Sequence, residues 1–146
     1  KAYLYLGSAT GLSQTPAWVM QGSRPNVKFG DAVAGVGDVN DDGFADVLVG
    51  APNYSDDQSS EGAIYLYLGG PTGLTHSAGW IGYGNKGEAF LGKVLNGAGD
   101  VNSDGKMDMV AGLPDFMVDT KKVGRSSAYY GTDDIHWVVF LPFIRH

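Results

Sequence analysis

The chain repeats itself at an interval of 62 residues, and this repeat limits its possible folds more than any other feature. Residues 3–52 and 65–114 align without a gap and share 21 identities in 50 positions. The best-preserved part is an acidic loop that begins at Asp38 and returns at Asp100. Such a period is typical of one supersecondary unit that stacks on copies of itself, so the sequence predicts a repeat architecture.

A third copy begins and then fades. Residues 124–131 match residues 62–69 only in their glycines and in one tyrosine. The closing residues 132–146 do not follow the repeat, and the stretch from Trp137 to Phe143 is more continuously apolar than any earlier one. We interpret 132–146 as a divergent C-terminal segment.

Each period is predicted to contain four short strands. Alternating apolar residues, β-branched and aromatic content and glycine punctuation place them in the middle period at 29–36, 45–50, 63–68 and 78–83. Four short strands in 62 residues match one blade of a β-propeller better than they match a helical repeat. The predicted fold class is therefore all-β, with blades of four antiparallel strands.

About 2.5 blades fit into the chain. Residues 1–22 would form a partial blade, 29–83 a complete blade and 91–131 most of a third one. Propeller rings close at about 4–8 blades, so this number cannot make a ring. We expect a fragment of a longer chain, with self-assembly of several copies as the alternative.

Composition excludes several partners and chemistries. The formal net charge is −6 and Lys and Arg are scattered, which argues against nucleic acid as a partner. The chain has no cysteine, so disulfides and thiol chemistry are excluded. No apolar run is long enough to cross a bilayer, and no signal peptide is visible. Because the chain begins at Lys1 without a methionine, we expect a mature or excised segment.

The two acidic loops have the residue types of a calcium site. Calcium takes about 6–8 oxygen ligands, and alternate positions of a tight loop can supply them, with glycine at position 6 permitting the sharp turn. The candidate ligands of the first loop are Asp38, Asn40, Asp42, the carbonyl of Phe44, and Asp46. Those of the second are Asp100, Asn102, Asp104, the carbonyl of Lys106, and Asp108. The sequence thus predicts two Ca²⁺ sites.

Three other kinds of loop begin with a similar pattern. An EF-hand or a dockerin loop needs an acidic residue at position 12, where this chain has Val49 and Ala111. Both of those loops also continue into a helix, whereas here an apolar strand follows. An Asx-rich turn without a metal would use the same residues. Retention of every side-chain ligand in both loops, while Asp41 becomes Ser103, favours the metal.

Residues around the loops resemble a known family. Phe29 and Gly30 precede the first loop, and residues 50–52 (Gly-Ala-Pro) end the strand after it. With residues 62–67, this pattern resembles the FG-GAP repeat of integrin α-subunit propellers and their bacterial and eukaryotic relatives. The second copy departs from it, since Leu91 replaces Phe29. The resemblance covers most of residues 1–131, and it implies a propeller, calcium in loops on one face, and adhesion or ligand binding outside the cell.

The function predicted from these features is a non-catalytic, calcium-binding segment of an extracellular or cell-surface adhesion or ligand-recognition protein. Its partners would be a protein or glycan ligand and the remainder of the propeller. The alternative is a propeller portion of a secreted hydrolase or lyase that acts on polysaccharide or lipid. A third possibility is a few-blade protein that assembles its ring from several copies.

Some remaining residues were assigned structural or surface roles. Trp18 and Trp80 occupy equivalent positions and are predicted to pack between blades. The tyrosine pairs Tyr3/Tyr5 and Tyr65/Tyr67 are given the same role. Three acidic residues of the polar loop before the third strand are expected to be solvated: Asp56, Asp57 and Glu61.

Overall fold

The computed structural model describes residues 1–132 and 138–141, which form strands and loops and no helix. The strands are β1 (Ala2–Leu4), β2 (Gly7–Ser8), β3 (Gly11–Leu12), β4 (Trp18–Met20), β5 (Val33–Gly37), β6 (Asp46–Ala51), β7 (Ala63–Tyr67), β8 (Trp80–Tyr83), β9 (Val94–Gly99), β10 (Asp108–Leu113), β11 (Met117–Val118), β12 (Lys121–Lys122), β13 (Arg125–Tyr129) and β14 (Val138–Leu141). Among these residues nothing has the length and apolarity of a membrane-spanning helix.

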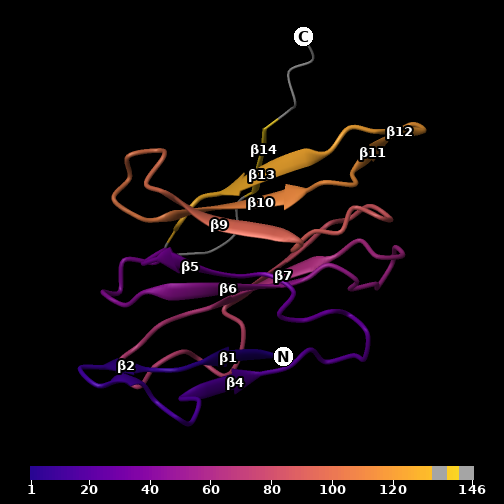
Figure 1. Cartoon of the computed structure of the whole chain (residues 1–146). Coiled ribbons are helices and arrows are strands. Elements are labelled where there is room, and N and C mark those ends of the chain that lie inside the picture. The colour runs from indigo at the N-terminus through magenta and orange to yellow at the C-terminus, as the bar shows by residue number, and fades with distance from the viewer. Residues whose placement is uncertain (133–137, 142–146) are drawn as a thin grey trace.

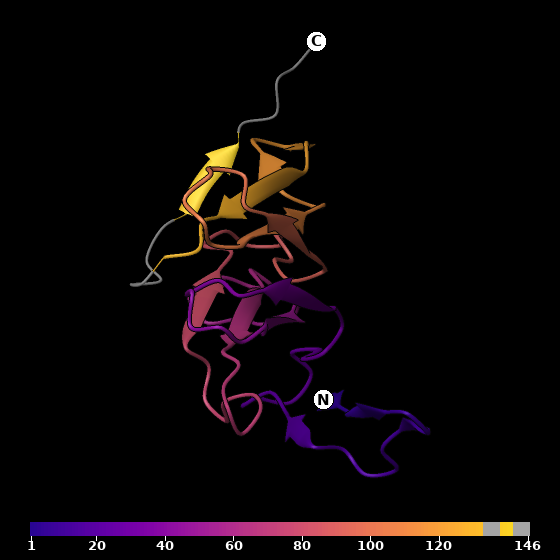
Figure 2. The same ribbon diagram turned by 90° about the vertical axis from the view of Figure 1, so that its left-hand side faces the viewer.

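Two four-stranded antiparallel sheets carry the repeat. The first has the order β5-β6-β7-β8, and the second β9-β10-β13-β14. Before them, β1 pairs with β4 in the way that β7 pairs with β8 in the next unit. The sheets stack in sequence order from the N-terminal to the C-terminal end (Figures 1 and 2). This arrangement confirms the predicted all-β fold of propeller blades.

Strand β14 completes the second sheet, although its sequence does not follow the repeat. Tyr129 pairs with Val138, and Ser126 pairs with Leu141. β14 therefore occupies the position beside β13 that β8 occupies beside β7. Residues 133–137 and 142–146, which include Trp137 and Phe143 of the predicted apolar stretch, lie outside the described residues.

The first strand of the middle sheet begins later than predicted. Strand β5 starts at Val33, whereas the sequence pattern placed the start at Phe29. The backbone takes positive φ angles at Lys28 (56°) and Gly30 (87°), and it turns there instead of running straight into the sheet. The Gly30 N–H donates to the carbonyl of Gly50 at 2.8 Å, so the turn is fixed against β6.

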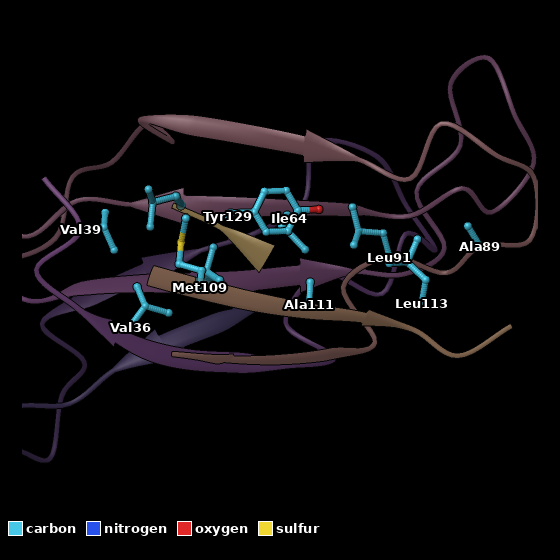
Figure 3. Packing of buried hydrophobic residues seen from close by; sticks show 11 residues of the cluster. Val36, Val39, Ile64, Ala89, Leu91, Met109, Ala111, Leu113 and Tyr129 are labelled. Carbon is cyan, nitrogen blue, oxygen red and sulfur yellow. The ribbon is translucent and has the colours of Figure 1, made fainter. Parts of the chain in front are cut away.

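The core consists of two layers, one on each face of the middle sheet. Because strand side chains alternate, Leu48, Ile64 and Leu66 face the following sheet, where they meet the buried side chains drawn in Figure 3. Val49 and Tyr67 face the partial sheet before it. Each blade is therefore buried only by its neighbours.

A tryptophan–tyrosine contact is repeated at both interfaces. The ring of Trp18 packs edge-on against Tyr67 with centroids 4.9 Å apart, and Trp80 packs against Tyr129 at 5.1 Å. Tyr65 joins the first interface through Phe29, 5.3 Å away. The predicted packing between blades is confirmed for both tryptophans.

The corresponding role of Tyr3 and Tyr5 stays a prediction. These side chains are 52% and 42% exposed, and their rings stack on each other with centroids 6.5 Å apart. Tyr3 in β1 and Tyr5 directly after it lie on the side of the partial sheet that no described sheet covers.

Truncating Trp18 should destabilise the chain strongly. Trp18→Ala removes the buried ring and the hydrogen bond from its indole N–H to the carbonyl of Thr75 (2.9 Å), so we expect a loss of about 3–5 kcal/mol. Leu12→Ala, at a side chain that is 73% exposed, is the control and should cost under about 0.5 kcal/mol. Urea unfolding followed by circular dichroism measures both, and equal losses would contradict the packing role.

Stability should also fall in alkali because of Tyr129. Burial raises the pKa of Tyr129 to about 12, against about 10 for an unfolded tyrosine. The folded state thus keeps the proton more tightly, so this group does not change stability below about pH 10 and lowers it as the pH rises from about 10 to about 12. The full loss is about 2–3 kcal/mol, and Tyr129→Phe should reduce it in denaturation series at these pH values. An unchanged pH profile in that variant would argue against the assignment.

Candidate metal loops

Both acidic loops connect the first and second strands of a four-stranded sheet. The first joins β5 to β6 and the second joins β9 to β10. They lie at the same side of the stack (Figure 1). A direct contact links them, since the Met107 N–H of the second loop donates to the carbonyl of Asp38 at 3.0 Å.

The first loop is closed by its own carboxylates. Asp38 accepts the N–H groups of Asp42 at 3.1 Å and Gly43 at 2.7 Å. The Asp42 carboxylate accepts the Phe44 N–H at 2.9 Å and the side-chain amide of Asn40 at 3.0 Å. Gly43 has a φ of +88°, so glycine at position 6 permits the turn as the sequence pattern predicts.

The second loop has nearly the same hydrogen bonds. Asp100 accepts the N–H groups of Asp104 (3.1 Å) and Gly105 (2.9 Å), and Gly105 has a φ of +93°. Asp104 accepts the Lys106 N–H and the Asn102 side-chain amide, each at 2.9 Å. The bond from the Lys106 backbone is the main cause that lowers the pKa of Asp104.

The aspartates at position 9 have a structural role that the sequence analysis missed. Asp46 is fully buried, and its carboxylate accepts the N–H groups of Val39 (2.9 Å) and Gly69 (2.7 Å). Burial raises the pKa of Asp46, and these two hydrogen bonds partly oppose the shift. The carboxylate joins the loop to the end of β7.

The second copy of this aspartate makes the equivalent bonds. Asp108 is also fully buried and accepts from Val101 at 2.7 Å and Gly131 at 2.9 Å. The glycine that follows the third strand recurs together with the aspartate in both copies. This joint recurrence is the sequence signal that could have revealed the link.

The residues present fit calcium in kind. Each loop offers carboxylate, amide and carbonyl oxygens, which are the hard ligands that calcium prefers. In the first loop the side-chain oxygen of Asn40 is buried and has no hydrogen-bond partner. A buried acceptor of this kind normally has one, so the atom is open to a cation. In the second loop the equivalent oxygen of Asn102 accepts the Asp104 N–H at 3.0 Å.

The loop carboxylates do not converge into a preformed cluster. Within residues 1–132 and 138–141, no three acidic, histidine or cysteine side chains are grouped closely enough to hold a metal ion. The hydrogen bonds give the physical reason, because Asp38 and Asp42 point their oxygens at N–H groups of their own loop.

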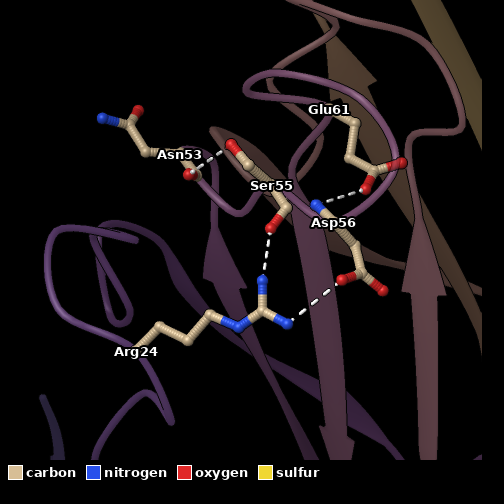
Figure 4. A network of polar contacts seen from close by, with 5 residues as sticks. All are labelled: Arg24, Asn53, Ser55, Asp56 and Glu61. Carbon is tan, nitrogen blue, oxygen red and sulfur yellow. Dashed lines mark hydrogen bonds and ion pairs between the residues drawn. The ribbon is translucent and has the colours of Figure 1, made fainter.

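A nearby polar network corrects one sequence-based expectation. Glu61 was expected to be solvated, but it is buried and its carboxylate accepts the Asp56 N–H at 3.1 Å (Figure 4). Asp56 itself is exposed and forms an ion pair with Arg24 at 3.0 Å. Arg24 also donates to the carbonyl of Ser55 at 2.7 Å. Glu61 thus holds the loop that precedes β7, which explains its burial.

Stacked antiparallel sheets with an acidic loop between their first two strands define a chain of β-propeller blades. Residues 29–67 match the model of the FG-GAP repeat, and integrin α relatives align with most of the chain. The chain therefore carries FG-GAP repeats and belongs with the integrin α-like propellers. Integrin alpha-5 of Xenopus laevis is 30% identical over 129 residues, 86% of this chain. Integrin alpha-8 of Mus musculus is 32% identical over 116 residues, 77% of the chain. The recognition of this family from its motif is confirmed.

One similar protein is an enzyme by name. Phosphatidylinositol-glycan-specific phospholipase D of Homo sapiens is 33% identical over 144 residues, which cover 89% of this chain. The chain spans only 12% of integrin alpha-5 and 16% of the phospholipase. The similarity therefore concerns a portion of each relative.

Replacing Asp46 should destabilise the chain even without calcium. Asp46→Ala leaves the Val39 and Gly69 N–H groups without their acceptor, and each such loss costs about 1–3 kcal/mol. Asp41→Ser, which copies Ser103 of the second loop, is the matched control and should be nearly neutral. Thermal and urea unfolding in a calcium chelator measure the difference. If Asp46→Ala matched the control there, the structural role would be excluded.

Proposed function

We propose that the chain is a calcium-binding propeller segment of an adhesion or ligand-recognition protein. The observation that carries the calcium proposal is the duplicated loop, in which the buried Asn40 oxygen has no partner. A ligand set that is kept twice, 62 residues apart, is difficult to explain by turn formation alone.

The proposed ligands are the residues predicted from the sequence. In the first loop they are Asp38, Asn40, Asp42, the Phe44 carbonyl and Asp46; in the second they are Asp100, Asn102, Asp104, the Lys106 carbonyl and Asp108. A bound calcium would neutralise the carboxylates that each loop concentrates beside the sheet. Because each loop joins two strands and the Met107 N–H links the loops, this neutralisation would stabilise the contact between neighbouring blades.

The cellular role is inferred from the integrin relatives. We propose an extracellular or cell-surface location and a protein or glycan as ligand, with calcium in a structural, non-catalytic role. The exposed rings of Tyr3 and Tyr5 support further blades as a second kind of partner, supplied by a longer chain or by other copies.

The second candidate is the propeller portion of a secreted hydrolase or lyase. The similarity to a phospholipase D supports it. A catalytic site would require acid–base groups placed together. Hydrolysis of lipid or polysaccharide by the chain would favour this candidate over the binding module. The activity should then be lost when one acidic or histidine side chain of the catalytic group is replaced.

Calcium should bind and raise the melting temperature. Isothermal titration calorimetry should show two sites, and chelator should lower the melting temperature of the native chain. The double variant Asp42→Ala, Asp104→Ala removes one exposed ligand from each loop and should lose much more stability in calcium than in chelator. Asp41→Ser again serves as the control. No bound calcium together with an unchanged melt would overturn the metal proposal.

A further inference from the structure

A pocket lies between the middle sheet and the following one, away from the acidic loops. Its volume is about 330 Å³, and the side chains that matter here are Trp80, Lys86, Leu91, Phe116, Arg125 and Ser127. Leu113, at the far end of β10 from the acidic loop, also lines it. The pocket shares no residue with the candidate metal loops, so an inference from it goes beyond the proposed function.

Three large residues of the preceding interface have smaller equivalents in the lining of the pocket. At the preceding interface the rings of Phe29 and Tyr65 contact each other. The equivalent residues 62 positions later, Leu91 and Ser127, both line the pocket. Met20, which packs into the first interface, is replaced by Gly82, but the Trp80 ring takes that space, since a Cβ at Gly82 would lie 2.5 Å from it. The room for the pocket therefore comes from the two rings, which Leu91 and Ser127 do not replace in full.

A fourth replacement brings a positive charge to the pocket. Arg125 stands where the first interface has the buried Ala63. Its guanidinium lies 5.1 Å from the centroid of the Phe116 ring. Burial lowers the pKa of Arg125, as expected for a charge that is partly removed from water.

Lys86 supplies a second positive charge. Its ammonium lies 4.9 Å from the Phe116 ring, as Arg24 lies 5.4 Å from the equivalent Tyr54 ring. Arg24 forms an ion pair with Asp56, but the residue equivalent to Asp56 is Val118. Among the described residues, no carboxylate forms an ion pair with Lys86.

Within the part of the chain that the structure describes, the lining combines these charges with rings and hydroxyl groups and has no acidic side chain. Asn85 brings an amide that can bond a polar ligand. Ser127 and Tyr129 bring hydroxyls that are buried and bonded to each other, and their remaining lone pairs can accept from a ligand. Trp80 and Tyr83 supply aromatic surface, and the volume is at the low end for small-ligand sites. Such a lining suits a compact, ring-shaped, hydroxylated anion.

We propose that this pocket between the sheets binds a carboxylated sugar residue. Lys86 and Arg125 bind its carboxylate, and the hydroxyl and amide groups of the lining bind the sugar ring. A free sugar acid and the terminal residue of an acidic glycan have this chemistry in common. Ser127, in place of Tyr65, leaves out a ring that would otherwise extend into this pocket.

The test uses the whole chain in calcium-containing buffer with methyl glucuronide as the probe. Calorimetry and amide chemical shifts should show binding, with shifts concentrated at residues 80–86 and 125–129. The neutral methyl glucoside should bind at least about 10-fold more weakly, because it lacks the carboxylate. Equal binding of the two sugars, no binding, or tighter binding of benzoate or an acidic peptide would overturn the proposal. A glucuronide-capped oligosaccharide that binds more tightly than the monosaccharide would identify a glycan terminus as the source.

Matched variants separate the pocket from general stability. Ser127→Tyr restores the residue of the first interface and should abolish binding. Arg125→Ala, which copies Ala63, should weaken binding about 10-fold or more. The arginine variant tests the pocket even if the tyrosine variant does not fold. Lys86→Gln should weaken binding similarly, whereas Arg24→Gln at the equivalent position of the other interface should leave it unchanged. Equal effects of Lys86→Gln and Arg24→Gln would exclude the pocket as the site. A chain that binds calcium but no glucuronide loses only this inference.

Discussion

Packing between successive sheets is the interaction on which the rest of the structure depends. The longest strands have only six residues, and the middle sheet is apolar on both faces. A sheet of this kind has no water-facing side and is stable only between neighbours. The repeated contact of Trp18 with Tyr67 and of Trp80 with Tyr129 sets the same spacing at both interfaces. The backbones of the two sheets approach closely there, since the Gly92 carbonyl would overlap any Cβ at Gly50. This close approach explains why the next-to-last residue of β6 is glycine.

The buried aspartates extend this order to the loops. Asp46 bonds N–H groups from two segments, one before β6 and one after β7, and Asp108 does the same one blade later. These bonds fix the two ends of the loop within the protein. A metal that binds there would have to draw oxygens of Asp38 and Asp42 away from some of their N–H partners, and it would relieve the repulsion among the carboxylates. This view reconciles a ligand set of calcium type with carboxylates that already accept hydrogen bonds.

The sequence was sufficient for the parts of the fold that follow the period. β-branched and aromatic runs with glycine punctuation predicted the strands of the middle sheet, because strands buried on both faces are apolar along their length. The turn at Lys28 was missed because positive φ at a lysine leaves no mark in the residue pattern. Strand β14 was missed because only pairing with β13 defines it, and its residues match no other copy. The burial of Glu61 was not predicted because it depends on a segment that is distant in the sequence. The segment at Leu91 lies against Glu61, and the Leu91 N–H donates to the Glu61 backbone carbonyl at 3.1 Å.

Departures from the repeat are more informative about ligands than its preserved positions. In a sealed interface, exchanging Tyr65 and Phe29 for residues like Ser127 and Leu91 would cost several kcal/mol through lost contacts and an empty cavity. At the second interface Leu91 and Ser127 are still buried, and the partly exposed Arg125 lies beside them in the lining of the pocket. An anion bound beside the Phe116 ring would gain charge-assisted hydrogen bonds from Lys86 and Arg125. Preserved positions such as Trp80 keep the two sheets at a fixed spacing. Because the spacing does not change, replacing a few large residues by smaller ones leaves a pocket between the sheets.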